Sequence, residues 1–135
     1  MSAIEFRFRH TMLPVGDLSR SVDFYTRLLG MQVLRERKDS EGGQNVAYVG
    51  YGDEGTHPVL ELIENTGNHE KPWAGHLALA VSDLPTLVKK LEAEGVRFDK
   101  PVVEPKSGTN TYIAFISDPD GFGIELNQRR GGIYS

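Results

Sequence analysis

Two histidines and two glutamates stand at matched positions along the chain and are its strongest candidates for chemistry. His10 is followed 51 residues later by Glu61, and His76 is followed 49 residues later by Glu125. Each glutamate lies inside an apolar stretch, where an ionised carboxylate is rarely buried unless it is paired or bound to a cation. Taken singly, each residue is more simply explained as an ordinary strand residue that faces solvent or is satisfied locally. The repetition of the pair is what favours a shared site.

A divalent metal ion is the ligand that best fits this set of side chains. Two neutral imidazoles and two carboxylates balance one divalent cation, and the chain has no cysteine to supply thiolates. Nitrogen and oxygen donors of this kind favour Zn, Ni, Co, Mn or Fe over Ca or Mg. Four protein ligands leave a five- or six-coordinate ion with open positions, as in a catalytic rather than a closed structural site. We therefore expect His10, Glu61, His76 and Glu125 to bind one metal.

The first pair sits in a recognisable order of structural elements. Apolar residues alternate with charged ones over residues 4–10, which predicts a strand. A helical stripe then runs from an N-cap at Asp17 to Gly30, a residue suited to the left-handed position after a helix. Further strands are predicted at residues 31–35, 46–51 and 59–63.

The second pair sits in a copy of the same order. A helix is predicted from a cap at Ser82 or Asp83 to Gly95, and a turn from Asp118 to Gly121. Strands are predicted at residues 76–81, 96–98, 111–117 and 122–127. The sequence therefore predicts an α+β fold built from two tandem β-α-β-β-β modules, at about residues 4–64 and 75–128 of a single domain of residues 1–135.

Composition excludes several classes of function. The 135-residue chain is 39% hydrophobic and carries a net charge of −4, which suits a globular domain and not a nucleic-acid binder with a basic face. It has no apolar run of the roughly 20 residues that a membrane span needs, and its N-terminus lacks a signal core. We therefore expect a cytoplasmic protein. His57 and His69 lie in polar stretches and are interpreted as surface residues, and Asp118 and Asp120 as turn residues.

Short motifs along the chain make this picture more specific. They are His10-Thr-Met-Leu, Val15-Gly-Asp-Leu, Ser21-Val-Asp-Phe-Tyr-Thr, Leu29-Gly-Met31, Gly50-Tyr-Gly52, Leu60-Glu-Leu62, Gly75-His-Leu-Ala78, Ala114-Phe and Asp118-Pro-Asp-Gly-Phe-Gly-Ile-Glu-Leu126. Together, from about His10 to Leu126, they resemble glyoxalase I (lactoylglutathione lyase), a family of the vicinal oxygen chelate superfamily.

The resemblance implies an architecture and an assembly. Each module would form a curved, incomplete barrel around the metal, and the protein would be a homodimer. The site would lie at the subunit interface, where His10 and Glu61 of one chain meet His76 and Glu125 of the other. The short chain is similar to the bacterial type that prefers nickel or cobalt. We therefore expect one divalent metal per site, with Ni(II) favoured and Zn(II) or Co(II) as alternatives.

The resemblance also implies a reaction, the detoxification of methylglyoxal. The substrate would be the hemithioacetal of methylglyoxal and glutathione, and the product S-lactoylglutathione. A proton leaves C1 to give an enediolate, whose negative charge the metal stabilises. A carboxylate then carries that proton to C2. Glu125 is the expected base, and Glu61 is its near-equivalent in the other module.

The sequence departs from the family pattern at one position. Where the family has an arginine that helps to hold a glutathione carboxylate, this chain has Pro14, which carries neither a charge nor a backbone donor. Losing a charge-assisted contact costs roughly 1.5–3 kcal/mol, or about tenfold to a hundredfold in affinity. Either Lys106 or an arginine replaces it, or the thiol differs. Asn65 matches the family's asparagine after the Glu-Leu strand and is a candidate for binding the thiol, although the aromatic expected next is Thr66.

Other members of the superfamily provide the alternative interpretations. A ring-cleaving dioxygenase would use two histidines and one carboxylate on Fe(II), and an epimerase would more naturally carry an amide in place of Glu61. A non-catalytic drug-binding resistance protein would lack the metal ligands. Because all four ligands are present, the sequence favours the lyase over these alternatives.

Overall fold

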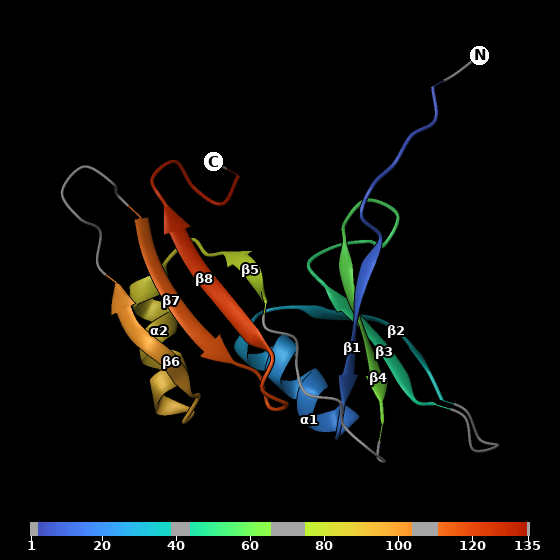
Figure 1. Cartoon of the computed structure of the whole chain (residues 1–135), viewed down its shortest axis with the longest axis horizontal. Helices are drawn as coiled ribbons and strands as arrows, with labels where there is room; N and C mark the ends of the chain where they lie inside the picture. The colour runs from blue at the N-terminus through green and yellow to red at the C-terminus, as the bar shows by residue number, and fades with distance from the viewer. Residues whose placement is uncertain (1–2, 39–43, 66–74, 104–110, 135) are drawn as a thin grey trace. The chain divides into compact units, whose positions relative to one another are not determined.

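The computed structural model describes residues 3–38, 44–65, 75–103 and 111–134. The chain divides into two compact units, Met1–Glu70 and Lys71–Ser135, and each unit is a β-α-β-β-β module with one four-stranded sheet (Figure 1). The predicted order of elements and the α+β class are confirmed. No helix in the described ranges is long and apolar enough to cross a membrane.

The first module has the sheet order β1-β4-β3-β2. Its first and last strands pair in parallel, and the other neighbours are antiparallel. Its elements are β1 (His10–Val15), α1 (Leu18–Asp23) with its π-helical continuation η1 (Phe24–Leu28), β2 (Gln32–Arg37), β3 (Val46–Gly50) and β4 (Val59–Glu64).

The second module repeats this topology with the order β5-β8-β7-β6. Again the first and last strands are parallel and the rest are antiparallel. Its elements are β5 (His76–Ala80), α2 (Leu84–Ala93), β6 (Phe98–Val103), β7 (Thr111–Ser117) and β8 (Gly123–Arg129).

Both helices start and stop as their sequences predict. The Asp17 carboxylate accepts a hydrogen bond from Arg20 N at 3.1 Å, and the Asp83 carboxylate accepts one from Thr86 N at 3.2 Å. Such N-caps satisfy backbone donors that the first helical turn leaves unpaired. Gly30 and Gly95 follow the helices with φ of 76° and 72°, a conformation that favours glycine.

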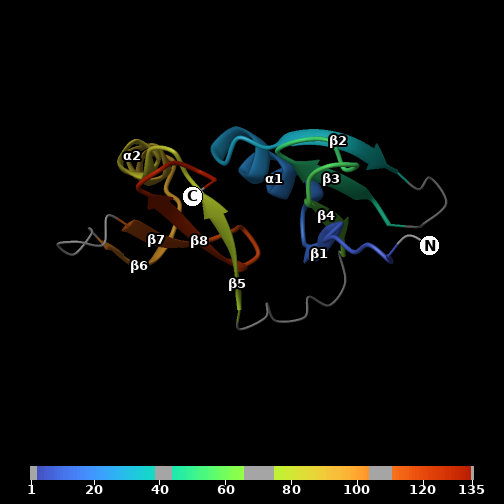
Figure 2. The same cartoon turned by 90° about the horizontal axis from the view of Figure 1, so that it is seen from above.

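Each helix covers one face of its sheet and leaves the other face open, as the turned view shows for α2 (Figure 2). Since side chains alternate along a strand, the helix face and the open face carry different residues. The helix faces hold the cores, with fully buried side chains at Leu13, Leu62, Ile124 and Leu126. His10, Glu61, His76 and Glu125 all lie on the open faces.

In each module, a side chain near the end of the last strand also caps the N-terminus of the helix. The Glu64 carboxylate at the end of β4 accepts a hydrogen bond from Leu18 N at 2.8 Å. The Gln128 side-chain oxygen near the end of β8 accepts one from Leu84 N at 2.6 Å. Each helix is therefore tied to the strand that carries the glutamate of its module.

Two predicted strand boundaries are wrong. Residues 3–9 form no strand, and Ile4, Phe6 and Phe8 are 82–91% exposed. The reason is that β4, which pairs with β1, begins opposite His10 at Val59, so the ladder ends there. The strand predicted at residues 96–98 instead runs from Phe98 to Val103, where two register shifts in its pairing with β7 obscure the alternation.

Candidate metal centre

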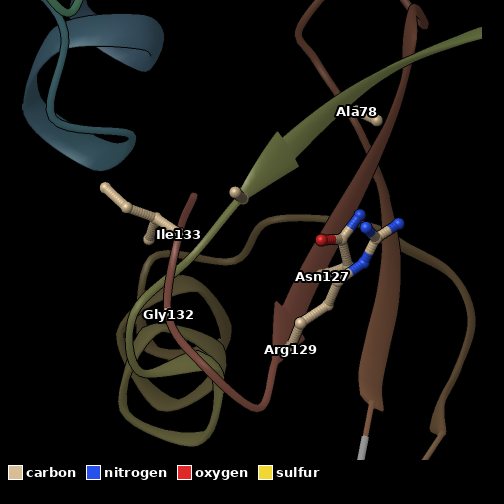
Figure 3. A pocket seen from close by; sticks show the side chains of 6 residues that line it. Ala78, Asn127, Arg129, Gly132 and Ile133 are labelled. Atoms are coloured by element: carbon tan, nitrogen blue, oxygen red, sulfur yellow. The ribbon is translucent and has the colours of Figure 1, made fainter. Parts of the chain in front are cut away.

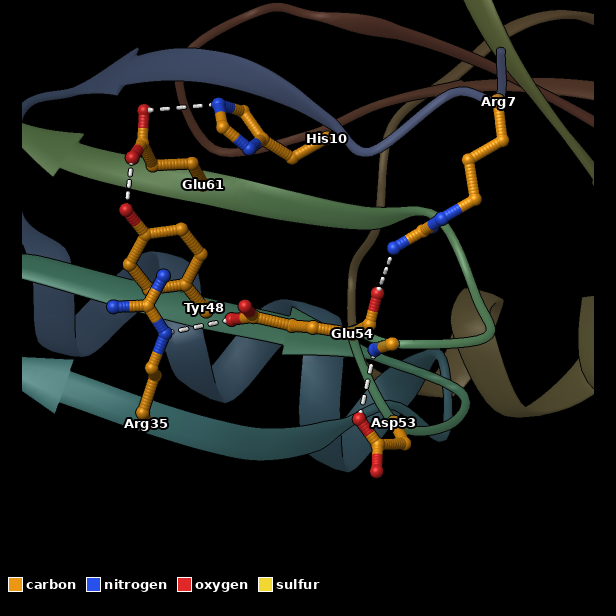
Figure 4. Close-up of polar contacts among 8 residues, drawn as sticks. Arg7, His10, Arg35, Tyr48, Asp53, Glu54 and Glu61 are labelled. Atoms are coloured by element: carbon orange, nitrogen blue, oxygen red, sulfur yellow. Dashed lines mark hydrogen bonds and ion pairs between the residues drawn. The ribbon is translucent and has the colours of Figure 1, made fainter. Parts of the chain in front are cut away.

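The parallel pairing of β1 with β4 brings the first histidine to the first glutamate. His10 stands opposite Val59 and Met12 stands opposite Glu61, so His10 and Glu61 are diagonal neighbours on the open face. Their atoms His10 Nε2 and Glu61 Oε1 are 3.7 Å apart (Figure 4). Residues far apart in the sequence thus meet because the last strand of the module returns beside the first.

The second module builds the same pair by the same register. His76 stands opposite Gly123, Ala78 stands opposite Glu125, and His76 Nε2 lies 3.6 Å from Glu125 Oε1. The two pairs are therefore equivalent positions of two equivalent sheets. This is the geometry that a duplicated half-site requires.

The carboxylates of both pairs are largely sheltered, while the imidazoles are more open. The Glu61 and Glu125 side chains are 15% and 22% exposed, and those of His10 and His76 are 36% and 45% exposed. Neither glutamate is a freely solvated strand residue. Each imidazole also meets an aromatic ring edge-on, Tyr48 in the first module and Phe115 in the second.

A different donor holds the second carboxylate oxygen in each module. The Tyr48 hydroxyl, directly across from Glu61 on β3, donates a short hydrogen bond to Glu61 Oε2. Phe115 occupies the corresponding place across from Glu125 and has no donor. There the amide of Asn127, two residues along β8, donates to Glu125 Oε2 at 2.8 Å. In both modules Oε2 is therefore anchored by the protein, and Oε1 is turned towards the histidine.

Tyr48 is itself held in place by charged neighbours. The Arg35 guanidinium stacks 3.7 Å from the centre of its ring and is fixed by a 2.8 Å hydrogen bond to the Glu54 carboxylate (Figure 4). The hydrogen bond that Tyr48 donates to Glu61, and the burial of Tyr48, both raise the pKa of its phenol above the usual value of 10.0. An ionised phenol would lose that hydrogen bond and repel the carboxylate, so Tyr48 is a neutral donor at neutral pH.

The sequence analysis did not identify Tyr48 or Asn127. Asn127 could have been found, because residues two apart on a strand share a face and Asn127 stands two residues after Glu125. Tyr48 could not, because its contact with Glu61 depends on the register between β3 and β4. A turn-rich segment, residues 51–58, separates those strands, and its composition does not fix that register.

The atoms within each pair fit a divalent metal ion. Two ligands about 2.1 Å from one ion, at angles of roughly 90° to 120°, lie about 3.0–3.6 Å apart. The observed Nε2 to Oε1 separation of 3.6 Å in the second module lies at the upper limit of this range, and that of 3.7 Å in the first module exceeds it by 0.1 Å. They also exceed an ordinary hydrogen bond, so the imidazole and the carboxylate are not simply satisfying each other.

Each pair supplies two of the four predicted ligands. Over the described ranges, no group of three or more histidine, cysteine, aspartate or glutamate side chains lies close enough to hold a metal. A histidine and one carboxylate alone leave a divalent ion short of the three or four protein ligands of known catalytic sites. Each module is therefore half of a donor set, and the four-ligand site stays a prediction.

The remaining residues singled out in the sequence are placed as follows. Asn65 directly follows β4, and its backbone N–H donates to Val15 O at 2.8 Å, which brings it to the end of the sheet that carries Pro14. His57 is exposed in a turn, and Asp118 is buried and caps its turn by accepting from Phe122 N at 2.9 Å. Thr66, His69 and Lys106 lie outside the described residues.

The chain matches a known family and its members over nearly its whole length. The family described as Glyoxalase/Bleomycin resistance protein/Dioxygenase superfamily matches residues 7–126. The lactoylglutathione lyase of Escherichia coli O157:H7 is 43% identical over 127 residues, covering 92% of this chain and 93% of its own. A probable lactoylglutathione lyase of Vibrio parahaemolyticus is 42% identical over 127 residues, covering 92% and 91%.

A solved structure with the same fold also carries related sequence. The glyoxalase I of Leishmania major, which is described as trypanothione-dependent, superimposes with a TM-score of 0.75 at 41% identity. The match covers 90% of this chain and 86% of that one. The fold seen here is thus shared with a solved glyoxalase I.

Proposed function

The chain belongs to the Glyoxalase/Bleomycin resistance protein/Dioxygenase superfamily, and from that membership we propose that it is a lactoylglutathione lyase. Relatives with this name are 42–43% identical and are covered almost end to end. The single observation that carries the proposal is the repeated histidine–glutamate pair, present at both equivalent positions. A drug-binding protein of the same fold would have no need of either pair.

In this proposal His10, Glu61, His76 and Glu125 hold one divalent metal. The Nε2 to Oε1 separations of 3.7 Å and 3.6 Å support it, as does the anchoring of each Oε2 by a protein donor. When bound, the cation stabilises negative charge that develops on the substrate oxygens. Nitrogen and oxygen donors without thiolate suit Ni(II), Zn(II) and Co(II), and of these we propose Ni(II).

We further propose that the protein is a homodimer and that each complete site takes one pair from each chain. The support is that each module holds only two ligands and presents them on a sheet face that its own helix leaves open. A catalytic divalent site takes three or four protein ligands. A second chain would supply the missing two without any change in the modules.

In this reaction the residues of the chain itself transfer a proton between two neighbouring carbons of the substrate. The Glu125 carboxylate takes the C1 proton of the hemithioacetal, and the C–H electron pair moves into a C1–C2 double bond while the carbonyl pair moves onto the C2 oxygen. Glu125 then returns the proton to C2, and the C1 hydroxyl proton passes to the C2 oxygen as the thioester carbonyl forms at C1. No co-reactant is consumed, because the product S-lactoylglutathione is an isomer of the adduct.

Two features equip Glu125 for this role. Its Oε2 accepts from Asn127, which fixes the plane of the carboxylate. Its hydrogen-bond donor Asn127 also lines a polar hollow on the same module, whereas Tyr48, the donor to Glu61, belongs to a cluster of buried apolar side chains. We propose Glu125 as the base and Glu61 as a ligand that stabilises the site. Asn65 is proposed to bind the thiol.

The experiment is an assay of thioester formation from methylglyoxal and glutathione, followed by ultraviolet absorbance, on protein loaded with Ni(II), Zn(II) or Co(II). We expect turnover with metal, none after chelation, and recovery when metal is restored. The absence of turnover with every metal would contradict the lyase proposal. Because the Leishmania major enzyme is described as trypanothione-dependent, trypanothione should be assayed beside glutathione.

A further inference from the structure

A polar hollow adjoins the His76–Glu125 pair on the open face of the second module. It has a volume of about 250 Å³ and is lined by Ala78, Ala80, Asn127, Arg129, Gly132 and Ile133. Its floor consists of two neighbouring strands, because Ala80 on β5 stands opposite Asn127 on β8. Small alanine side chains on β5 leave room above the sheet for a ligand.

Asn127 links the hollow to the proposed catalytic base. Glu125, Asn127 and Arg129 are alternate residues of β8 and therefore share one face of the sheet. The Asn127 amide links the two regions, since it donates to Glu125 at 2.8 Å and also lines the hollow. Figure 3 shows the Arg129 guanidinium reaching back along β8 towards that amide. A molecule with its reacting carbon at Glu125 would extend along β8 into the hollow.

The far wall of the hollow is made by the chain after β8. Gly131 and Gly132 have φ of 100° and 94°, left-handed values that allow the backbone to turn back on itself. The turn is closed by a hydrogen bond from Gly132 N to Arg129 O, and it returns Ile133 to the edge of the hollow. The same turn therefore fixes the end of β8, where Arg129 stands.

From this geometry we infer that Arg129, with Asn127, binds a carboxylate of the thiol co-substrate. The inference rests on the proposed lyase function and deepens it. A guanidinium beside an amide offers several N–H donors in a plane, which is the arrangement that recognises a carboxylate. It would supply on β8 the cation that the sequence lacks at Pro14 on β1.

The dimensions of the ligand agree with this assignment. Glutathione has a carboxylate at each end and its thiol on the middle residue, so either carboxylate can extend roughly 8–10 Å from the reacting carbon on the sulfur. Residues four apart on a strand are about 13 Å apart, and the long arginine side chain shortens that span as it reaches back. A thiol adduct reacting at Glu125 thus places a carboxylate near the Arg129 guanidinium. A small uncharged thiol would gain nothing from it.

The test compares Arg129→Gln with Arg130→Gln in the full, metal-loaded chain. Arg130 is the next residue, is also exposed, and does not line the hollow. We expect Arg129→Gln to raise KM for the glutathione adduct roughly tenfold with kcat unchanged. It should leave the adduct of uncharged 2-mercaptoethanol unaffected, and Arg129→Lys should recover part of the loss. Arg130→Gln should match the parent with both thiols.

Several results would overturn the inference. These are an unchanged KM in Arg129→Gln, an equal loss with both thiols, or an equal loss in Arg130→Gln. Calorimetric binding of S-methylglutathione separates this inference from the lyase proposal, because it needs no turnover. Arg129-dependent binding without turnover would contradict only the lyase proposal. Turnover with Arg129-independent binding, or no binding to the parent, would contradict only the carboxylate site.

Discussion

The open faces of the two modules share a histidine–glutamate pair and differ in almost everything around it. In the first module the surroundings of the pair are apolar and buried. Val46, Tyr48 and Val59 pack together there, and Leu34 and Ile63 pack beside them. In the second module Gly123 takes the register position of Val59, and Asn127 takes that of Ile63. The first face is filled by the protein itself, and the second is left hollow and polar.

The helix faces, by contrast, have changed little. Leu62 and Leu126 each follow the glutamate and are fully buried, and Glu64 and Gln128 each cap a helix. The duplicated backbone therefore retains what packing requires, and the modules diverge where they can contact a ligand. In the proposed function, the first module accordingly contributes mainly metal ligands, while the second also contributes to binding the substrate.

The largest expected effect is on kcat, and it comes from replacing the carboxylates of Glu125 and Glu61 with amides, one at a time. If Glu125 is the base, Glu125→Gln should lower kcat by about 10²–10⁴-fold, the usual contribution of a general base. Glu61→Gln should lower it less, because it removes a ligand charge but not the proton carrier. Metal affinity, measured by competition with a chelator, should fall in both. A larger kcat loss in Glu61→Gln would reverse the proposed roles.

Next in size are matched truncations on the helix faces. Leu62→Ala and Leu126→Ala should each lower the free energy of unfolding by about 2–5 kcal/mol, since each removes a fully buried side chain and leaves a cavity. Denaturant unfolding of the metal-free protein measures both. If one substitution costs less than about 1 kcal/mol, the two helix faces are not equivalent in packing.

Tyr48→Phe gives the first module the residue type that the second has at Phe115. It should lower the free energy of unfolding by about 1–2 kcal/mol, because Glu61 loses a donor while the ring stays in place. The same variant should weaken metal binding, since Glu61 Oε2 is no longer anchored. Unchanged stability and unchanged metal affinity would show that the phenol contributes nothing to the pair.

The difference in the free energy of unfolding between the parent and Tyr48→Phe should depend on pH, and the direction of that dependence is defined. The folded-state pKa of Tyr48 is raised above 10.0, so its stabilisation is fully present below that pH and is lost as the pH rises through the folded value. The stability gap between the parent and Tyr48→Phe should be constant from neutral pH to about pH 9. It should narrow above pH 10.0. A gap that widens there would contradict the assigned hydrogen bond.

The smallest expected effect comes from exchanging the helix caps. Glu64→Gln should lower the free energy of unfolding by about 0.3–1 kcal/mol, because a negative charge near a helix N-terminus is stabilising. Gln128→Glu should raise it by a similar amount at low ionic strength. Thermal unfolding at two salt concentrations measures both, and added salt should shrink both effects. Effects of the same sign in the two variants would contradict this explanation.

Most of the fold could be predicted from the sequence, because local patterns determine it. Helix caps, terminal glycines and strand alternation placed the helices and most strands correctly. The errors came where pairing overrides pattern, at residues 4–9, which have no partner strand opposite them, and at β6, whose ladder is irregular.

The site was predictable only in part, for a related reason. The repetition of sequence revealed the two histidine–glutamate pairs, and the pairing of the first and last strands of each module brings the two members of each pair together. Tyr48 and Arg129 carry no such signal. What they do depends on which side chain lies across a strand and on how the chain turns after β8.

The parallel pairing of the first and last strands also determines at what stage of folding each histidine–glutamate pair can form. The histidine leaves the ribosome at the start of its module and the glutamate at the end, so the pair forms only when the longest loop of the module closes. Contacts of such high sequence separation slow folding. An incompletely closed module therefore lacks the pair that is proposed to hold the ion, and an ion bound only to the closed form would protect it from reopening.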